Sequence, residues 1–142
     1  MIVLDANVLL YAYDSHSPAF EKAKEWLEGV FSDGTPIGLP WQTILAFLRI
    51  STDPRLPGSR FSIEEASSLV DRWLEQPNVR LLSGSDEHWP ILRATMKDGQ
   101  ARGPLVGDAH LAALAISFGA TLYTTDRDFA RFPGLRWANP LA

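Results

Sequence analysis

The sequence contains no cysteine, which rules out disulfide bonds, thiolate metal ligands and cysteine nucleophiles. It also lacks an apolar run of the roughly 20 residues that a membrane-spanning helix needs. The first residues, Met1 to Asp5, show no basic stretch followed by a long apolar segment, so no signal peptide is expected. These absences favour a cytoplasmic protein that works without a membrane.

Positive charge is scarce as well. Lys and Arg total 13 against 17 for Asp and Glu, a formal net charge of −4 at pH 7. This balance argues against a protein that coats nucleic acid by bulk charge. It is compatible with a nucleic-acid enzyme, because bound divalent cations would reverse the sign of the charge at the site.

The length and patterning predict one compact domain over residues 1–142, without repeats or linkers. Short apolar runs alternate with segments of helical periodicity. Strands are expected at residues 1–4, 37–39, 79–82, 121–124 and 136–138. Strands separated by helices indicate βαβ units, and right-handed crossovers place helices on both faces of a parallel sheet. The predicted class is therefore α/β with a parallel sheet of four to five strands.

Capping signals predict several helix ends. Ser62, followed three residues later by Glu65, forms a capping-box pattern. Ser85 is expected to cap the next helix. Residues 99–107 are expected to form a loop, after which Asp108 opens the last long helix.

Three aspartates fall where a functional site is expected. Asp5 follows the first strand directly, Asp126 follows the fourth, and Asp108 lies in the first turn of the helix that leads into the fourth strand. Asp128 lies two residues beyond Asp126. Because ligands of open parallel sheets bind outside the carboxyl ends of the strands, these side chains are expected to meet at one edge.

Clustered carboxylates repel one another unless a cation neutralises them. Oxygen ligands without His or Cys suit Mg²⁺, for which Mn²⁺ can substitute. A magnesium site can polarise a phosphodiester and activate water. The expected reaction is therefore hydrolysis of a phosphodiester bond.

Each aspartate also has a purely structural interpretation. Asp5 could cap a short helix that starts near Val8, and Asp108 could cap the helix that it opens. Asp126 could act as a turn residue. The joint placement of the three is more specific than any one of them.

Three segments closely resemble the PIN-domain toxins of VapBC toxin–antitoxin systems. They are Val3-Leu-Asp-Ala-Asn-Val-Leu-Leu10, Asp108-Ala-His-Leu-Ala-Ala-Leu-Ala115 and Thr124-Thr-Asp-Arg-Asp-Phe129. Residues 47–55 and 132–137 are similar to the family too. The resemblance implies a three-layer α/β/α fold, a Mg²⁺-dependent endoribonuclease that acts on RNA, neutralisation by a cognate VapB antitoxin, and a homodimer.

The resemblance also implies roles for individual residues. Carried over by position, Asp5 matches the first metal ligand, Asp108 the ligand on the late helix, and Asp126 the fourth acidic position. Asn7 matches a small polar position that braces the cluster by hydrogen bonding. Asp128 is expected to support the site.

One position departs from the family. The usual pattern has a second acid, commonly Glu, on the helix after the second strand, but residues 41–50 contain none and the aligned positions are Ala46 and Phe47. This loss predicts weaker metal binding, or one ion instead of two, with Asp128 as partial compensation. It leaves open a catalytically weak or inactive PIN-like module that binds RNA or protein. A haloacid-dehalogenase-like phosphatase is disfavoured, because Asn7 stands where that family needs its second aspartate.

RNA requires positive contacts besides the metal. Arg102, in the loop expected at 99–107, is the best candidate for a contact with substrate. His16, His88 and His110 are assigned to surface or packing roles, since nothing pairs them with a nucleophile or a metal motif.

The antitoxin is expected to bind as an amphipathic segment in an apolar groove between helices. Residues 8–31 and 66–74 are rich enough in large apolar side chains to provide such a groove.

Overall fold

The structure, a computed structural model, describes residues 1–57 and 60–142. Five parallel strands form one sheet in the order β3-β2-β1-β4-β5. The strands are β1 (Ile2–Leu4), β2 (Ile37–Pro40), β3 (Val79–Leu82), β4 (Thr121–Tyr123) and β5 (Arg136–Ala138). The predicted α/β class and parallel sheet are confirmed, and each predicted strand end lies within one residue of the observed one.

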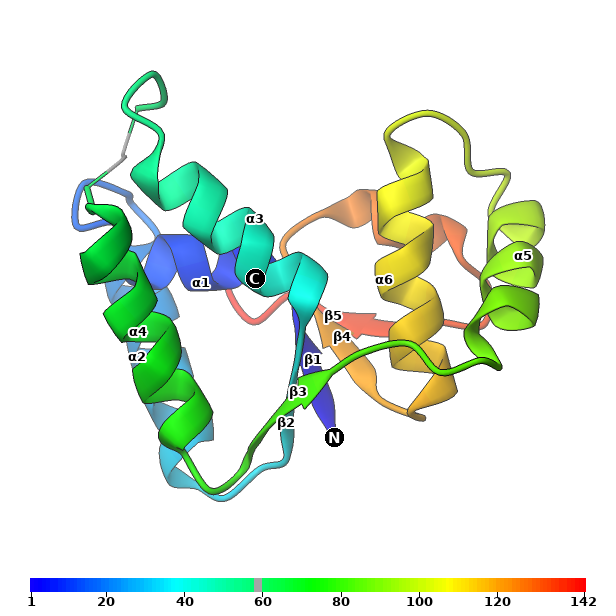
Figure 1. Cartoon of the computed structure of the whole chain (residues 1–142), viewed down its shortest axis with the longest axis horizontal. Helices are drawn as coiled ribbons and strands as arrows, with labels where there is room; N and C mark the ends of the chain where they lie inside the picture. Colours follow the sequence, from blue (N-terminus) through cyan, green and yellow to red (C-terminus); the bar gives the residue numbers. More distant parts are fainter. Residues whose placement is uncertain (58–59) are drawn as a thin grey trace.

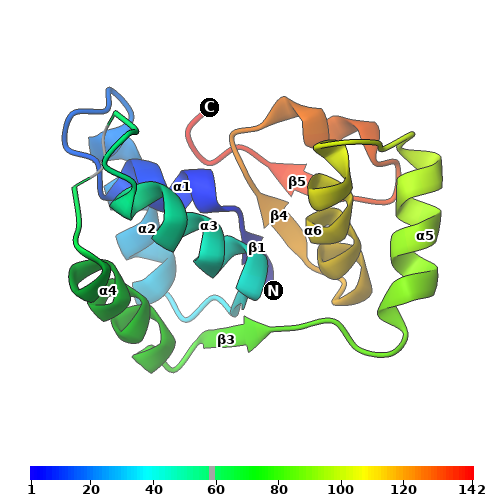
Figure 2. The same ribbon diagram turned by 45° about the horizontal axis from the view of Figure 1, so that its top comes forward.

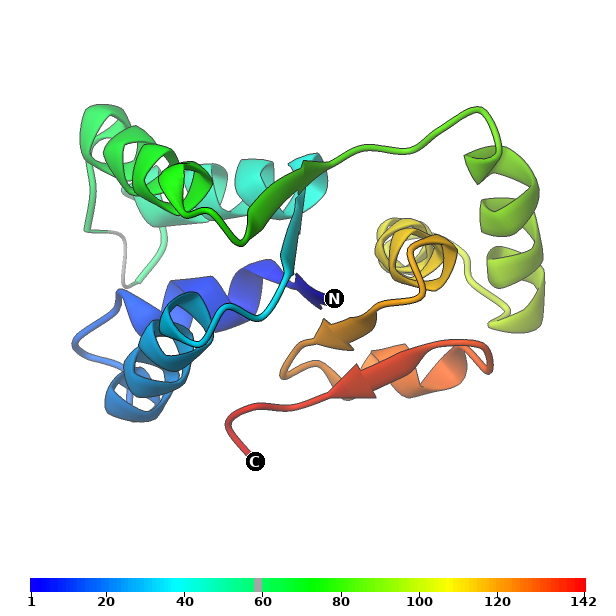
Figure 3. The ribbon, with the colours of Figure 1, turned by 90° about the horizontal axis from the view of Figure 1, so that it is seen from below.

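The helices form two groups, one on each side of the sheet (Figures 1 and 3). The helices are α1 (Ala6–Ala12), α2 (Phe20–Ser32), α3 (Trp41–Thr52), α4 (Ile63–Glu75), α5 (His88–Asp98), α6 (Leu105–Ser117) and the 3₁₀ helix η1 (Arg127–Arg131). In Figure 1, α1 to α4 lie on the left of the strands, and α5 and α6 on the right. Within the described residues, no helix has both the length and the apolar character needed to cross a membrane.

Two hydrophobic cores lie on opposite faces of the sheet, because successive side chains of a strand point to opposite sides. Ile2 and Leu4 pack in the core that faces α1 to α4. Val3 and Leu122 pack in the other core, against α6. Every residue of β1 and β2 is buried, as expected for parallel strands covered on both faces.

The capping box predicted at Ser62 is confirmed. The Ser62 hydroxyl accepts a bond from Glu65 N at 3.1 Å, and the Glu65 carboxylate accepts one from Ser62 N at 3.0 Å. The cap predicted at Ser85 is wrong, because α5 begins only at His88 and its N-cap residue makes no side-chain bond. The Ser85 hydroxyl instead closes a turn before the helix, accepting a bond from Glu87 N at 3.2 Å.

The predicted start of the last long helix at Asp108 is also wrong. Helix α6 begins at Leu105 after Pro104, whose ring holds φ at −59°, a helical value. Residues 105–107, predicted as loop, are therefore helical, and the connection from α5 spans only residues 99–104. Asp108 lies one turn inside the helix.

Candidate metal centre

The site is built where β1 and β4 end side by side. Leu4 of β1 pairs with Tyr123 of β4, so the next residues, Asp5 and Thr124, leave the sheet together. The backbone N–H of Asp5 still donates to Tyr123 O at 3.0 Å. Two positions 119 apart in sequence thus become neighbours at the carboxyl edge of the sheet.

Three carboxylates converge at this edge. One oxygen each of Asp108, Asp126 and Asp128 lies within 4.8 Å of the others. Asp126 caps η1 by accepting a bond from Asp128 N at 2.9 Å, which folds the chain back and brings Asp128 into the group. We call these three residues the acidic group. Figures 1 and 2 show the orange η1 segment beside the first turn of α6, which carries Asp108.

Asp5, a predicted ligand, is not among the three carboxylates that lie within 4.8 Å of one another, and hydrogen bonds fix its side chain. Its Oδ1 accepts a bond from Ala6 N at 2.7 Å and thereby caps α1. Its Oδ2 accepts bonds from the Thr124 hydroxyl at 2.7 Å and from Asn7 Nδ2 at 3.3 Å. Asp5 therefore has the capping role considered above, and its second oxygen is turned toward the edge of the sheet.

Thr124 connects the two parts of the site. Its fully buried hydroxyl donates to Asp5 and accepts bonds from Asp126 N at 3.0 Å and Asn7 Nδ2 at 3.2 Å. The Asn7 side-chain oxygen in turn accepts a bond from Thr125 N at 3.3 Å. Asn7 lies where a bracing role was predicted, whereas Thr124 was missed, because a threonine at the end of a strand has no distinctive sequence signal.

Burial and mutual repulsion perturb these acids. Burial raises the pKa of Asp108 to about 6, assisted by the negative charges of Asp126, Asp5 and Asp128 and opposed by Arg131. Burial likewise raises the pKa of Asp5, with a further contribution from Asp126, while the bonds from Thr124 and Ala6 oppose the rise. Two carboxyls that resist ionisation beside other acids would be relieved by a bound cation.

The donor set fits a hard divalent ion. All candidate ligands are carboxylate oxygens, and neither His nor Cys contributes. Among residues 1–57 and 60–142, no other cluster of three such side chains is close enough to hold a metal ion. Asp108 is a residue of the helix body and not its N-cap, so capping does not explain its position.

Helix α3 has no acid at positions 46 and 47, where the family resemblance led us to expect one, but its Gln42 contacts α6 beside the acidic group. Phe47 is buried in the core with its ring 4.7 Å from that of Trp73, and Ala46 lines a hollow that faces α6. Gln42 Nε2 donates to Gly107 O at 2.8 Å, one residue before Asp108. The buried Gln42 Oε1 has no hydrogen-bond partner among the described residues. No sequence pattern distinguishes Gln42 as a residue of the site.

The predicted substrate residue Arg102 is exposed and lines a polar hollow together with Arg131, which was not predicted. The histidines take no part in the acidic group. His88 and His110 instead hydrogen-bond to each other at 2.8 Å between α5 and α6.

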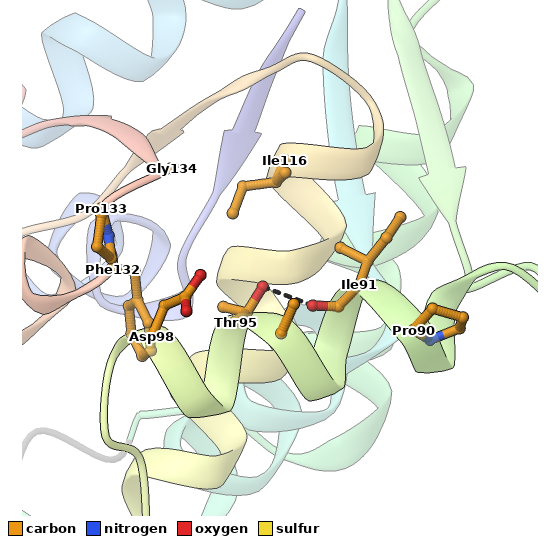
Figure 4. A pocket seen from close by; sticks show the side chains of 9 residues that line it. Pro90, Ile91, Thr95, Asp98, Ile116, Phe132, Pro133 and Gly134 are labelled. Atoms are coloured by element: carbon orange, nitrogen blue, oxygen red, sulfur yellow. Dashed lines mark hydrogen bonds between the residues drawn. The ribbon is translucent and has the colours of Figure 1, made fainter.

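A separate apolar hollow of about 350 Å³ lies between α5 and the segment before β5 (Figure 4). Its lining includes Ile91, Ile116 and Phe132, and Asp98 is its one charged side chain. No residue of the acidic group borders it.

Comparisons with known proteins agree with this architecture. A family profile described as PIN domain matches residues 2–135. Ribonuclease VapC33 of Mycobacterium tuberculosis is 36% identical over 141 residues, covering 99% of each chain. Ribonuclease VapC37 of the same organism is 37% identical over 142 residues, covering 100% of this chain and 99% of its own.

A solved structure shares the fold. VapBC2 from Rickettsia felis, bound to a DNA fragment from their promoter, contains a chain that superposes with a TM-score of 0.72 at 21% identity and 98% coverage of both chains. The profile match and the full-length identities lead to one conclusion: the chain belongs to the PIN domain family, in the group of proteins named VapC.

Proposed function

We propose that this protein is a metal-dependent endoribonuclease, the toxin of a VapBC-type toxin–antitoxin system, which acts on RNA in the cytoplasm. The observation that carries the proposal is the convergence of Asp108, Asp126 and Asp128 within 4.8 Å, with Asp5 linked to Asp126 through the hydroxyl of Thr124. The full-length relatives that are named ribonucleases support it. Because the site draws on both ends of the sequence, we infer that residues 1–142 act as one domain.

Mg²⁺ is the proposed cofactor, with Mn²⁺ as a substitute. Asp5, Asp108 and Asp126 would hold it, and Asp128 would support them. A bound divalent ion supplies charge that polarises the scissile phosphate and activates a water molecule. Helix α3 has Ala46 and Phe47 where the resemblance implies a carboxylate, so the ligand set favours one ion over two.

The protein groups around the site orient these ligands. Thr124 and Asn7 hold Oδ2 of Asp5, and Thr124 also fixes the backbone at Asp126. Gln42 anchors the first turn of α6, which carries Asp108. Such supporting bonds fix the direction of each carboxylate before substrate arrives.

A cognate VapB-type antitoxin is the proposed protein partner. An apolar hollow of about 300 Å³ lies between α1 and α2 and is lined by Tyr13, Phe20, Leu27 and Phe31 among others. Its size and lining suit an amphipathic segment that inserts apolar side chains.

A homodimer is the proposed assembly. Trp41, Leu45 and Val106 are 51%, 59% and 42% exposed and border a wide hollow between α3 and α6. Apolar side chains gathered in this way are typical of an interaction surface.

The missing helix acid favours one alternative, a PIN-like module that binds RNA without cutting it. RNA cleavage by the purified protein in Mg²⁺, in Mn²⁺ and in EDTA separates the two. The proposed function predicts cleavage with either ion and none in EDTA, and Asp5→Asn and Asp108→Asn should each reduce the rate by at least about 100-fold.

Asp86→Asn is the matched control, because Asp86 is an exposed aspartate in the turn before α5 and should leave the rate unchanged. RNA binding that is indifferent to EDTA, without cleavage in any divalent ion, would favour the binding module. Cleavage by Asp5→Asn at the parent rate would refute the assignment of Asp5.

A further inference from the structure

A polar hollow of about 510 Å³, lined by Gln100, Arg102, Leu105 and Arg131, lies beside the acidic group. We propose that this hollow binds a backbone phosphate of the RNA, next to the phosphate that is cut. The inference deepens the proposed function and rests on it.

The same two helices, α6 and η1, carry residues of both the hollow and the acidic group. Leu105 precedes Asp108 by three residues on α6, so both lie on the same side of the helix. Arg131 follows Asp128 by three residues in η1, where side chains three apart are eclipsed.

The charges in the hollow suit an anion. Arg102 and Arg131 are the charged groups of its lining, and within the described residues neither forms a salt bridge with a carboxylate. Arg131 Nη1 donates to Gly99 O at 3.0 Å, which anchors the side chain at one nitrogen. A planar guanidinium offers several donors in a fixed geometry that matches phosphate oxygens.

The connection between α5 and α6 is built to present these side chains. Gln100 has φ of 52°, a left-handed conformation that non-glycine residues rarely adopt, and Gly103 has φ of 58°. Ala101 N donates to Met96 O at 2.9 Å, and Leu105 N donates to Arg102 O at 3.2 Å. These bonds fix Arg102 just before the N-terminus of α6, whose dipole adds partial positive charge.

RNA backbone phosphate is the ligand that fits both the acidic group and the two arginines of the hollow. A phosphodiester held at the acidic group requires a cation there, and the adjoining phosphate of the same strand then meets the two arginines. The hollow would thus set the position of the strand, because contacts with phosphate fix register without reading the bases.

The test is a phosphate scan. Short RNA oligonucleotides, each with one neutral methylphosphonate linkage, are titrated in Mn²⁺ with protein that carries the slow-cleaving Asp5→Asn substitution, and binding is followed by fluorescence anisotropy. This protein, which serves as the parent for the variants below, should lose affinity at one linkage adjacent to the cleavage position. Arg102→Gln and Arg131→Gln should bind unmodified RNA about 5- to 10-fold more weakly and become insensitive to that linkage. Each variant should also reduce the salt dependence of log Kd by about 0.7 per lost contact.

Arg136→Gln is the matched control for Arg131, because the Arg136 guanidinium also donates to a backbone carbonyl, that of Gly119, but on β5. It should bind RNA as the parent does. Arg131→Lys retains the positive charge but lacks the planar guanidinium with its several donors, so it should bind RNA with intermediate affinity. A role of Arg131 in folding alone would lower the thermal midpoint and the Mn²⁺ affinity together, and that result would overturn its assignment.

The outcomes separate the two proposals. If the arginine variants bind like the parent, or if no single linkage stands out, the subsite is wrong, while cleavage by the unsubstituted protein keeps the nuclease proposal intact. If binding depends on both arginines but no divalent ion produces cleavage, the hollow binds RNA phosphate as proposed, and the nuclease proposal fails.

Discussion

At the level of single residues, the hydroxyl of Thr124 joins the two halves of the site. It donates to Asp5 and accepts bonds from Asn7 and from the backbone of Asp126. These bonds hold Oδ2 of Asp5 toward the same edge that carries the acidic group. The arrangement shows how a residue that is not a candidate ligand determines the geometry of residues that are.

Asp108 makes the stability of the metal-free protein depend on pH. Its folded-state pKa of about 6 lies above the ordinary value of 3.8, so the folded chain retains a proton that the unfolded chain releases. Stability in EDTA should therefore decrease as the pH rises from about 4 to about 6 and then level off. Thermal unfolding of the parent across this range measures the effect.

Asp108→Asn should flatten this dependence, because the amide does not titrate. At pH 7 in EDTA the variant should be more stable than the parent by on the order of 1 kcal/mol, after allowance for solvent screening at this partly exposed site. Mn²⁺ should raise the unfolding temperature of the parent more than that of the variant. A parent whose stability in EDTA rises between pH 4 and pH 6 would contradict the assignment.

The sequence predicted that Asp108 and Asp126 lie close together, because strand ends of a parallel sheet share an edge. It gave Asp128 only a supporting role, although Asp128 is the third converging carboxylate, and Asp5, predicted as the third member, lies outside this group. Arg131 was not predicted, because its position relative to Asp108 depends on how the short 3₁₀ helix η1 folds back. A helix of this length produces no hydrophobic periodicity from which it could be predicted.

At the level of secondary-structure elements, the packing of α5 against the C-terminal segment depends on Gly99. A Cβ at this position would meet the ring of Phe132, which is 2% exposed, so the ring would have to shift. Gly99→Ala should destabilise the fold by about 1–3 kcal/mol through overpacking. Denaturant unfolding with urea measures the change.

Gly29 provides the contrasting control. It lies on the exposed side of α2, and an added Cβ would meet nothing within 4 Å. Gly29→Ala should stabilise the protein by about 0.5–1 kcal/mol, because glycine is unfavourable inside a helix. Equal effects of the two substitutions would show that the contact with Phe132 does not constrain the fold.

Strands were predicted to within a residue because buried apolar runs bounded by turn residues have few alternative structures. Helix starts were less reliable. Ser85 and Asp108 both have good capping side chains, yet α5 begins two residues later than a cap at Ser85 would give, and α6 begins three residues before Asp108. At Asp108 the decisive residue was Pro104, whose ring favours the start of a helix.

At the level of the whole molecule, two apolar surfaces lie on different helices and can be tested against each other. The α3–α6 surface with Trp41 and Leu45 is proposed to join two copies of the chain. The α1–α2 hollow with Phe20 is proposed to bind the antitoxin.

Trp41→Ser combined with Leu45→Ser should convert the dimer to a monomer in sedimentation equilibrium and leave antitoxin binding unchanged. Phe20→Ser should weaken binding of the co-purified antitoxin at least about 10-fold and leave the dimer intact, because each change removes apolar contact area from one surface alone. Trp89→Ser, at a tryptophan that is 59% exposed on α5, is the control for both. A dimer that survives the double substitution would refute the α3–α6 assignment.

The pairing of β1 with β4 has a consequence for synthesis of the protein. While the ribosome is still making the second half of the chain, Asp5 is already present, but the residues that must surround it have not been translated. A nascent chain therefore has no assembled centre until Asp128 has left the exit tunnel. Only 14 residues follow Asp128, so the centre cannot assemble before synthesis of the chain is nearly complete.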